Sequence, residues 1–381
     1  MNSAIYYQGK PLAQASGEVA DSLRLLLSLY LQRRSFRSLN HPPFITPLPG
    51  YDYIECTTGG SSGIPKVIRR RLTSWIGSFD VNQQRFHLNQ DDRYAVLGDL
   101  NHSLALYAVC ESLHLGLAID ILSGMRPRAQ LERMTAQATR VLYVTPTQLR
   151  LLTALHVPCH TVRLILCGGS KLDPLLRRQA MRCFPGAELY EFYGASETSF
   201  ITLADAQTPE GSVGKAYPGV NIEIRHRQGD IGEVWVNSPY LFENYCIGGS
   251  DDTRQSAGYL TVGELGRLDD QGYLWLSGRK SRMVTSSDKN VYPESVETLI
   301  SQHIGQALCA VIAHPDPLRG HVLHAFIEGD NHAGSERSLR AAIRQQLGEE
   351  MEPRRFFYLP ALPLLASGKP DLKKLESYPL S

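Results

Sequence analysis

Hydrophobic and polar positions follow two alternating periods along the chain, which predicts an α/β protein. Leucines at helical spacing predict one amphipathic helix from Glu18 to Arg33. After Tyr53, short apolar runs alternate with helical stretches, an order that favours a parallel sheet covered by helices. The predicted strands are Tyr94–Leu97, Leu117–Ile121, Val141–Val144, Leu164–Cys167 and Leu189–Phe192. The predicted helices between them are Leu104–His114, Pro146–Leu155 and Pro174–Phe184.

The pattern changes twice more toward the C-terminus. From Gly211 to Ser277 the helical spacing disappears, and runs bounded by Gly, Asp and Pro predict hairpins of a β-rich subdomain. The last hundred residues are predicted as helix, strand, strand and helix at Pro293–His303, Leu308–Ala313, His321–Glu328 and Glu336–Leu347. The polar segment Lys280–Arg282 is the predicted hinge. We therefore expect a large N-terminal domain, residues 1–280, and a small mobile α+β C-terminal domain, residues 281–381.

Composition and charge exclude several classes of protein. The 381 residues are 43% hydrophobic and 20% charged, which is ordinary for a folded globular chain. The net charge of +1 gives no attraction to nucleic acid, so we expect no nucleic-acid partner. The apolar run Leu25–Leu31 is too short to span a membrane, and the first residues lack the layout of a secretory signal, so we expect a cytoplasmic protein.

The seven cysteines suggest neither a disulfide framework nor a zinc ribbon, because they are scattered and no C-x-x-C pair occurs. The grouping of His156, Cys159 and His160 lacks a fourth ligand at the usual spacing. We interpret these three residues as buried or incidental.

The first motif with chemistry is a loop that follows the strand-like segment Tyr53–Cys56. Its glycines let the backbone approach a ligand, its N–H groups and hydroxyls are donors for phosphate oxygens, and its lysine adds a charge. It differs from a Walker A loop, because Ile and Pro follow its last glycine. The alternative is a flexible linker, which would need neither the Pro nor the Lys. The candidate phosphate-binding residues are Thr57, Thr58, Gly59, Gly60, Ser61, Ser62, Gly63 and Lys66.

The second motif, Glu191–Thr198, follows the last predicted strand of the α/β region. Ligands bind at the carboxyl ends of strands in open α/β sheets. The ring of Tyr193 could stack on a base, and the carboxylate of Glu197 beside the hydroxyl of Ser196 could hold Mg²⁺. The alternative is an ordinary turn with a solvated glutamate.

Two further motifs are weaker when taken alone. Glu264, in a Gly-Glu-Leu-Gly stretch, and Arg279, in Ser-Gly-Arg, could clamp the hydroxyls of a ribose, or could form an exposed pair on a hairpin. Lys369 lies in the sequence Ala-Ser-Gly-Lys-Pro-Asp near the C-terminus, where a lysine is usually a solvated charge.

Together and in this order, the four motifs resemble those of the acyl-adenylate-forming superfamily, which includes acyl-CoA synthetases, nonribosomal adenylation domains and luciferases. The resemblance extends from about Tyr53 to Leu375. Tyr193–Glu197 matches the Tyr-Gly-x-Thr-Glu motif with Ser196 for Thr, and Leu164–Ser170 resembles the strand and Gly-Gly turn beside the adenine and acyl groups.

The resemblance implies a role for each matching residue. It assigns the loop from Thr57 to Lys66 to the β- and γ-phosphates, Glu197 to Mg²⁺ and Ser196 to the α-phosphate. It implies that Lys369 is the catalytic lysine of the C-terminal domain and that His102 lies beside the acyl pocket. The implied nucleotide contacts are completed by Gly169, Tyr193, Gly194, Glu264 and Arg279.

The chain departs from the family pattern at several points. The phosphate loop comes early, so the N-terminal region is expected to be shortened, which leaves a surface for a partner or a second copy of the chain. Glu264 stands where the family has Asp. The hinge carries Ser281 and Arg282, and Asp288 stands where the family has Gly, so the first half-reaction is better supported than the second.

The implied function is ATP-dependent activation of a carboxylic acid to acyl-AMP with release of pyrophosphate. Transfer to a thiol follows, and the thiol belongs to CoA or to the phosphopantetheine arm of an acyl carrier protein. The pocket walls fit an aryl or a medium-chain acid equally well, and transfer to a carrier protein would make the chain a loading enzyme of secondary metabolism. The run Arg69–Arg71 could meet CoA phosphates or an acidic carrier protein, although we favour a solvated helix start. The alternative function is a non-catalytic scaffold that holds a nucleotide or acyl-AMP.

Overall fold

The structure is a computed structural model that describes residues 4–58, 66–286, 289–304, 307–330, 333–364 and 370–379. The loop residues Gly59, Gly60, Ser61, Ser62 and Gly63 lie outside the described residues, as do Asp288 and Lys369.

A nine-stranded sheet forms the centre of the molecule, with the strand order β13-β12-β11-β10-β9-β7-β8-β1-β2. The strands from β11 to β1 in this order run parallel, and antiparallel pairs close both edges. These strands are β1 Ile5–Tyr7, β2 Lys10–Pro11, β7 Arg93–Val96, β8 Ala118–Ile121, β9 Val141–Val144, β10 Leu164–Gly168, β11 Glu188–Ala195, β12 Ser199–Ala204 and β13 Lys215–Ala216.

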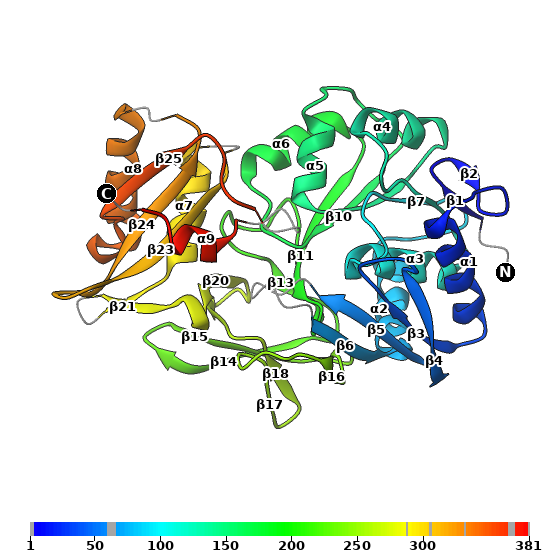
Figure 1. Cartoon of the computed structure of the whole chain (residues 1–381), viewed down its shortest axis with the longest axis horizontal. Helices are drawn as coiled ribbons and strands as arrows, with labels where there is room; N and C mark the ends of the chain where they lie inside the picture. The colour runs from blue at the N-terminus through cyan, green and yellow to red at the C-terminus, as the bar shows by residue number, and fades with distance from the viewer. Residues whose placement is uncertain are drawn as a thin grey trace.

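Helices cover both faces of this sheet, as parallel strands buried on two sides require. In Figure 1, α4, α5 and α6 lie above the sheet and α1, α2 and α3 lie below it. Two separate apolar cores result, one beneath α4–α6 and a larger one on the side of α1–α3. The helices are α1 Glu18–Leu31, α2 Leu72–Arg85, α3 Ser103–Leu115, α4 Pro127–Ala136, α5 Pro146–Thr153 and α6 Pro174–Cys183.

Two further sheets complete the larger part of the chain. The five-stranded sheet has the order β16-β6-β5-β3-β4, with β3 Arg34–Ser38, β4 Ile45–Tyr51, β5 Tyr53–Thr58, β6 Lys66–Arg71 and β16 Asn244–Ile247. The six-stranded sheet contains β14 Asn221–Gln228, β15 Ile231–Asn237, β17 Arg254–Ser256, β18 Tyr259–Thr261, β19 Glu264–Leu268 and β20 Leu274–Arg279. The second of these sheets is the β-rich subdomain expected from the sequence.

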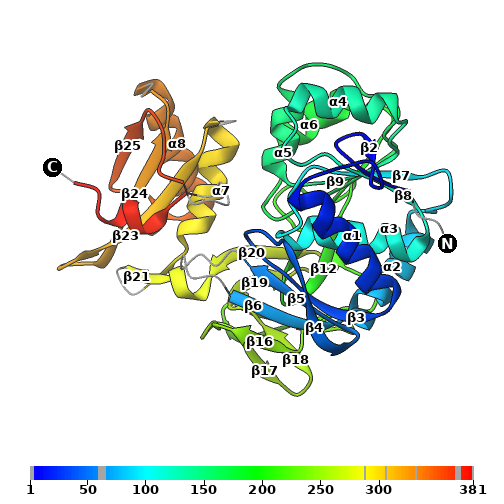
Figure 2. The same cartoon turned by 45° about the vertical axis from the view of Figure 1, so that its right-hand side comes forward.

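The C-terminal segment folds into a separate α+β unit, which stands apart from the rest in Figures 1 and 2. Its core is formed by α7 and α8 packed on the sheet β23-β24-β25. The elements are η1 Lys280–Arg282, β21 Val284–Ser286, β22 Lys289–Val291, α7 Pro293–Ile304, β23 Cys309–Asp316, β24 Gly320–Glu328, α8 Ala333–Leu347, η2 Glu349–Met351, β25 Arg355–Leu359 and α9 Leu372–Glu376. The predicted fold class is confirmed, and the division at residue 280 stays a prediction. Among the described residues, no helix combines the length and apolar character that crossing a bilayer would take.

One local prediction is wrong. The run Arg69–Arg71 is not a helix start but the end of strand β6, and α2 begins only at Leu72. Side chains alternate along a strand, so the three arginines face two different environments. Arg70 is 1% exposed, whereas Arg69 and Arg71 form ion pairs with Glu55 and Glu243.

A polar network lies inside the larger core. The carboxylate of Glu111, in α3, is fully buried and accepts hydrogen bonds from the hydroxyls of Tyr143 at 2.5 Å and Tyr94 at 3.0 Å. The amide of Asn82, in α2, donates to its other oxygen at 2.8 Å. Burial raises the pKa of Glu111 to about 7, although these donors oppose the shift.

This network predicts a pH dependence of stability. A buried carboxyl with a raised pKa binds a proton in the folded chain at pH values where the unfolded chain has lost it. The free energy of unfolding should therefore fall between about pH 4.5 and pH 7, with Glu111 contributing of order 3 kcal/mol at most. In Glu111→Gln this component is absent, which urea unfolding at pH 5 and pH 7.5 measures. The exposed substitution Glu188→Gln is the control, and an unchanged pH difference in Glu111→Gln would contradict the assignment.

Candidate active site

The hairpin between β11 and β12 presents the second motif at the carboxyl edge of the main sheet. A side chain at position 194 would place its Cβ 1.8 Å from the backbone oxygen of Ser199, so only glycine fits there. The turn is fixed by the Ala195 N–H, which donates to the hydroxyl of Thr198 at 2.9 Å. Tyr193 therefore lies two residues before the end of β11, and Ser196 and Glu197 occupy the turn that follows this strand.

Glu197 is held by a tyrosine from the five-stranded sheet. The hydroxyl of Tyr245, in β16, donates to Glu197 Oε1 at 2.7 Å and lies 2.9 Å from the hydroxyl of Thr253. Burial raises the pKa of Tyr245, and the charge of Glu197 adds to the shift, so the phenol stays protonated. Within the described residues Glu197 has no ion-pair partner at salt-bridge distance, so no neighbouring cationic side chain occupies its carboxylate.

Ser196 meets the start of α3. Its hydroxyl lies 3.0 Å from the hydroxyl of Ser103, the first residue of that helix. His102 immediately precedes Ser103, and its side chain is exposed. The structure thus brings the predicted α-phosphate residue and the predicted acyl-pocket segment to one place, although the contact is made by Ser103.

Glu264 and Arg279 are direct cross-strand neighbours on β19 and β20. Arg279 Nε donates to Glu264 Oε1 at 3.0 Å. The hydroxyl of Tyr193 is buried near them without a hydrogen-bond partner in the described part of the chain. Burial raises the pKa of Tyr193, and the charge of Glu264 adds to this while Arg279 opposes it. The three residues form one cluster although they come from two different sheets.

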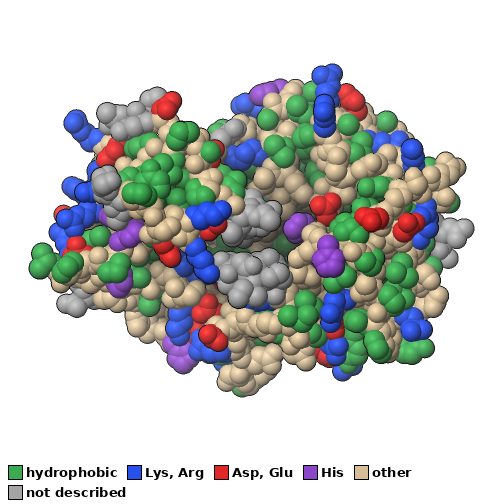
Figure 3. Space-filling model, viewed as in Figure 1, with side chains coloured by type: hydrophobic (Ala, Val, Ile, Leu, Met, Phe, Trp, Pro, Cys, Tyr) green, Lys and Arg blue, Asp and Glu red, His purple; other side chains and the backbone are tan. Residues whose placement is uncertain are grey.

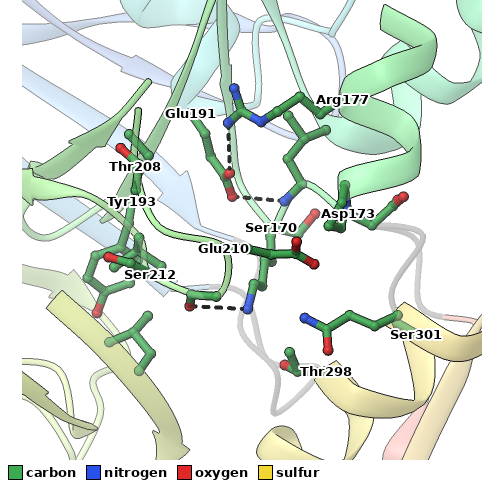
Figure 4. Close-up of a pocket in the computed structure, with 18 of the residues that line it drawn as sticks. Ser170, Asp173, Arg177, Glu191, Tyr193, Thr208, Glu210, Ser212, Thr298 and Ser301 are labelled. Atoms are coloured by element: carbon green, nitrogen blue, oxygen red, sulfur yellow. Dashed lines mark hydrogen bonds and ion pairs between the residues drawn. The ribbon is translucent and has the colours of Figure 1, made fainter. Parts of the chain in front are cut away.

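A cavity of about 640 Å³ connects this cluster with the C-terminal unit. Figure 3 shows the molecule hollowed between its two parts, and Figure 4 shows the lining residues. Thr298 and Ser301 of α7 face Ser170 and Asp173 across the cavity. Five of the residues predicted from the sequence line it, namely Gly169, Tyr193, Gly194, Glu264 and Arg279.

One wall of the cavity is strongly polar. Glu191 accepts hydrogen bonds from the Leu172 N–H at 2.8 Å and from Arg177 Nη2 at 3.4 Å, and Lys171 Nζ donates to the Gly211 carbonyl at 3.3 Å (Figure 4). Burial raises the pKa of Glu191 and lowers that of Lys171. Sequence reasoning named the segments of Glu191 and Lys171 but missed Arg177, because one arginine in a helix carries no signal of its own.

The predicted phosphate loop connects β5 and β6, which pair up to Thr58 and Lys66. The hydroxyl of Thr57 is buried and donates to the Ser38 carbonyl at 2.9 Å, so it stabilises the five-stranded sheet. Lys66 Nζ lies 6.0 Å from the ring centroid of Tyr245, the tyrosine that holds Glu197. The end of the loop and the second motif therefore lie against the same side chain.

These residues fit a magnesium ion shared with phosphates. Mg²⁺ prefers oxygen ligands and is usually bound through one or two carboxylates together with substrate phosphates. Glu197 supplies such a carboxylate beside two hydroxyls. Within the described ranges no cluster of three acidic, His or Cys side chains competes as a metal site.

The fold and the site together are those of an α/β enzyme with a cavity at the carboxyl edge of its main sheet. More particularly, the chain belongs to the AMP-binding enzyme family. The sequence model of that family matches residues 51–246, and the model of the AMP-binding enzyme C-terminal domain matches residues 295–369.

Relatives and solved structures agree with this assignment. The acyl–CoA ligase YhfT of Bacillus subtilis (strain 168), itself described as uncharacterized, is 30% identical over 86% of this chain and 68% of its own length. The o-succinylbenzoate CoA synthetase of Bacillus subtilis, in complex with its acyl-adenylate intermediate, has the same fold with a TM-score of 0.75 and 24% identity, over 86% of this chain and 69% of that chain. The amide bond synthetase McbA of Marinactinospora thermotolerans gives 0.73 and 25%, over 85% and 69%.

The prediction of an acyl-adenylate-forming ligase is therefore confirmed at the level of the family. The alternative, a non-catalytic scaffold, finds no support among these relatives. The roles of the individual residues stay predictions.

The geometry of Glu264 and Arg279 predicts that they contact ribose. A hydrogen bond to a charged group contributes about 1.5–3 kcal/mol, so the chain should bind ATP tenfold or more tightly than 2′,3′-dideoxy-ATP. Glu264→Ala should lose part of this preference and Glu264→Ala/Arg279→Ala should bind both nucleotides alike, which titration calorimetry measures. Asp270→Ala, an exposed acid on the same hairpin, is the control and should keep the preference. A preference that survives in the double variant would exclude the ribose contact.

Proposed function

We propose that this chain activates a carboxylic acid with ATP and transfers the acyl group to the thiol of CoA. In the first step a carboxylate oxygen attacks the α-phosphorus, a C(O)O–P bond forms, and the bond to the β-phosphate breaks with release of pyrophosphate. In the second step a thiol attacks the acyl carbon, and AMP leaves as the thioester forms. The family and the ligase relatives support both steps.

The observation that carries the proposal is the convergence of separate segments on one cavity. The turn after β10, the end of β11 and the β19–β20 hairpin are far apart in sequence, yet all line it. Catalysis of such a transfer depends mainly on positioning and on stabilising charge at the phosphates. Residues brought together by three rigid strands provide that positioning.

Each motif is then assigned to bind one part of the nucleotide. We assign the β- and γ-phosphates to the β5–β6 loop with Lys66, the adenine to Tyr193 and the ribose to Glu264 with Arg279. Ser196 would bind the α-phosphate, and Glu197 would hold Mg²⁺, which neutralises charge on the phosphates when it is bound. Lys369 would bridge the carboxylate and the α-phosphate, and residues 281–381 would move as a lid about Lys280–Arg282.

The acid would lie beside Ser196, near Ser103. The neighbouring wall is tight, because the ring of Phe192 lies against Gly168, where a Cβ would come within 2.2 Å of a ring carbon. Phe192 also packs edge-on against Phe200, with ring centroids 4.7 Å apart. This aromatic wall suits an aryl or an unbranched aliphatic acid.

The proposal also names the acceptor thiol and the cellular location. We name CoA because the ligase relatives are named for it, and an acyl carrier protein is the second candidate. A chain that consumes ATP and CoA is expected in the cytoplasm, where both are supplied. A second copy of the chain as partner stays a prediction.

A panel of carboxylic acids tests the proposal directly. We expect ATP–pyrophosphate exchange that depends on one class of acid and on Mg²⁺, and thioester formation when CoA is added. A panel in which the acyl carrier protein replaces CoA separates the two acceptors. Nucleotide binding without exchange for any acid would instead favour the scaffold.

Substitution of the lysine near the C-terminus tests the two half-reactions separately. Lys369→Ala should slow adenylation by about 10²–10³-fold or more, the scale of losing one preorganised donor to a developing charge. Thioester formation from supplied acyl-AMP should be retained. Lys373→Ala, an exposed lysine on α9, is the control. Equal losses in both half-reactions would refute the assigned role.

A further inference from the structure

Three consecutive arginines at the end of β6 have different surroundings. Arg69 and Arg71 point to one face, where their guanidinium carbons each lie 5.5 Å from the ring centroid of Tyr53. Each is also paired with a carboxylate, Arg69 with Glu55 at 2.5 Å and Arg71 with Glu243 at 2.6 Å. Arg70 points the other way, into the core, so the three residues cannot share one role.

The guanidinium of Arg70 is held by neutral groups. It donates to the hydroxyl of Ser199 at 2.7 Å, to the Tyr240 carbonyl at 3.2 Å and to the Ser196 carbonyl. Its central carbon lies 5.1 Å from the ring centroid of Trp75, a cation–π distance. Within the described part of the chain it forms no ion pair, although it is 1% exposed.

A buried cation without a paired carboxylate is costly, because desolvation disfavours the charged form. Burial lowers the pKa of Arg70 to about 10, and the charge of Glu197 opposes this shift. The side chain is therefore still charged at neutral pH. By contrast, the equally buried Glu55 is compensated by two arginines, Arg37 and Arg69. A charge left uncompensated in this way suits a place where negative charge arrives with a ligand.

Arg70 also joins the two segments that hold Glu197. One is the turn containing Ser196 and Ser199, whose carbonyl and hydroxyl it binds. The other begins at Tyr240 and continues to Phe242, whose N–H donates to the Glu197 carbonyl at 2.8 Å, and then to Tyr245. Removal of the guanidinium would take away its hydrogen bonds to Ser196 and Ser199 on one side and to Tyr240 on the other.

We propose that Arg70 is a positioning residue that fixes Ser196 and Glu197 and provides a permanent positive charge behind the α-phosphate and Mg²⁺ of the bound nucleotide. This inference rests on the proposed function, since it presumes that a nucleotide binds there. Arg70 acts through the turn rather than by touching the substrate. No acid or thiol needs to be known to test it.

Binding of Mg·ATP to the full chain, measured by titration calorimetry, is the test. Arg70→Met removes the charge and the hydrogen bonds at similar volume, and we expect its Kd to rise tenfold or more at unchanged stoichiometry. Arg70→Lys keeps the charge and should recover most of the affinity. Thermal unfolding of each variant shows whether it is folded at the temperature of the titration.

Two matched controls separate positioning from general damage. Ile68→Val loosens the same face of β6 two residues away, and Arg71→Met removes a paired surface arginine; both should keep the wild-type Kd. A wild-type Kd in folded Arg70→Met, or in Arg70→Lys should Arg70→Met not fold, would overturn the proposal. So would an Arg70→Lys variant no better than folded Arg70→Met. A wild-type chain that binds no Mg·ATP would contradict the proposed function instead.

Discussion

The close approach of Gly194 to Ser199, just before the chain reverses at Ser196–Thr198, is the constraint on which the site depends. Strand β11 runs parallel to β10, and β12 returns antiparallel along its other edge. This return is possible only because position 194 has no Cβ to meet the Ser199 carbonyl. A turn placed there lies at the carboxyl edge of the sheet, where helices and loops leave a crevice. Tyr193, Ser196 and Glu197 owe their shared position to that single close approach.

The core accommodates buried charge in three different ways. The differences distinguish charged residues that stabilise the fold from one that lies beside the candidate active site. Glu55 is paired with two arginines, as expected of a carboxylate that stabilises the five-stranded sheet. Glu111 is satisfied by tyrosine hydroxyls and an amide, and burial raises its pKa until it holds a proton near neutral pH. Arg70 remains charged among neutral acceptors. Of the three, only the last is a charge without an ion-pair partner among the described residues, and it lies beside the site.

Much of the fold could be predicted from the sequence, because its strands are short apolar runs and its helices have leucines at regular spacing. The expected helix Pro293–His303 and the observed α7, Pro293–Ile304, differ by one residue. Only the start of helix α2 was predicted, at the arginine run, and its extent was not, because its buried face includes Ser74, Ser78 and Asn82, which weaken the apolar period. The arginine run was misassigned for a related reason. Three like charges suggest solvent, and only tertiary contacts show that the middle one is buried.

The site itself was predictable as a set of motifs but not as a geometry. Glu264 and Arg279 could be named from the sequence, but their register on neighbouring strands depends on the β19–β20 hairpin and its bulge. Tyr245 gave no signal, because its importance comes from the pairing of β16 with β6 beside the loop. Glu264 and Arg279 are 15 positions apart, and Tyr245 and Glu197 are 48 positions apart. The local sequence pattern contains no information about these contacts. A resemblance to a family contains it indirectly, because members of a family share a fold.

The contacts between the C-terminal unit and the rest explain how one cavity is shared by two parts of the chain. Arg282, in the hinge, pairs with Glu294 at 3.2 Å and with Glu297 at 2.7 Å inside the C-terminal unit, whereas the Ser295 hydroxyl donates across the junction to the Ser277 carbonyl at 2.7 Å. Leu265 adds an apolar contact to the C-terminal core. The junction therefore combines a polar contact with an apolar one. Since Glu294 and Thr298 also line the cavity, any rotation at Arg282 changes the wall that faces the nucleotide site.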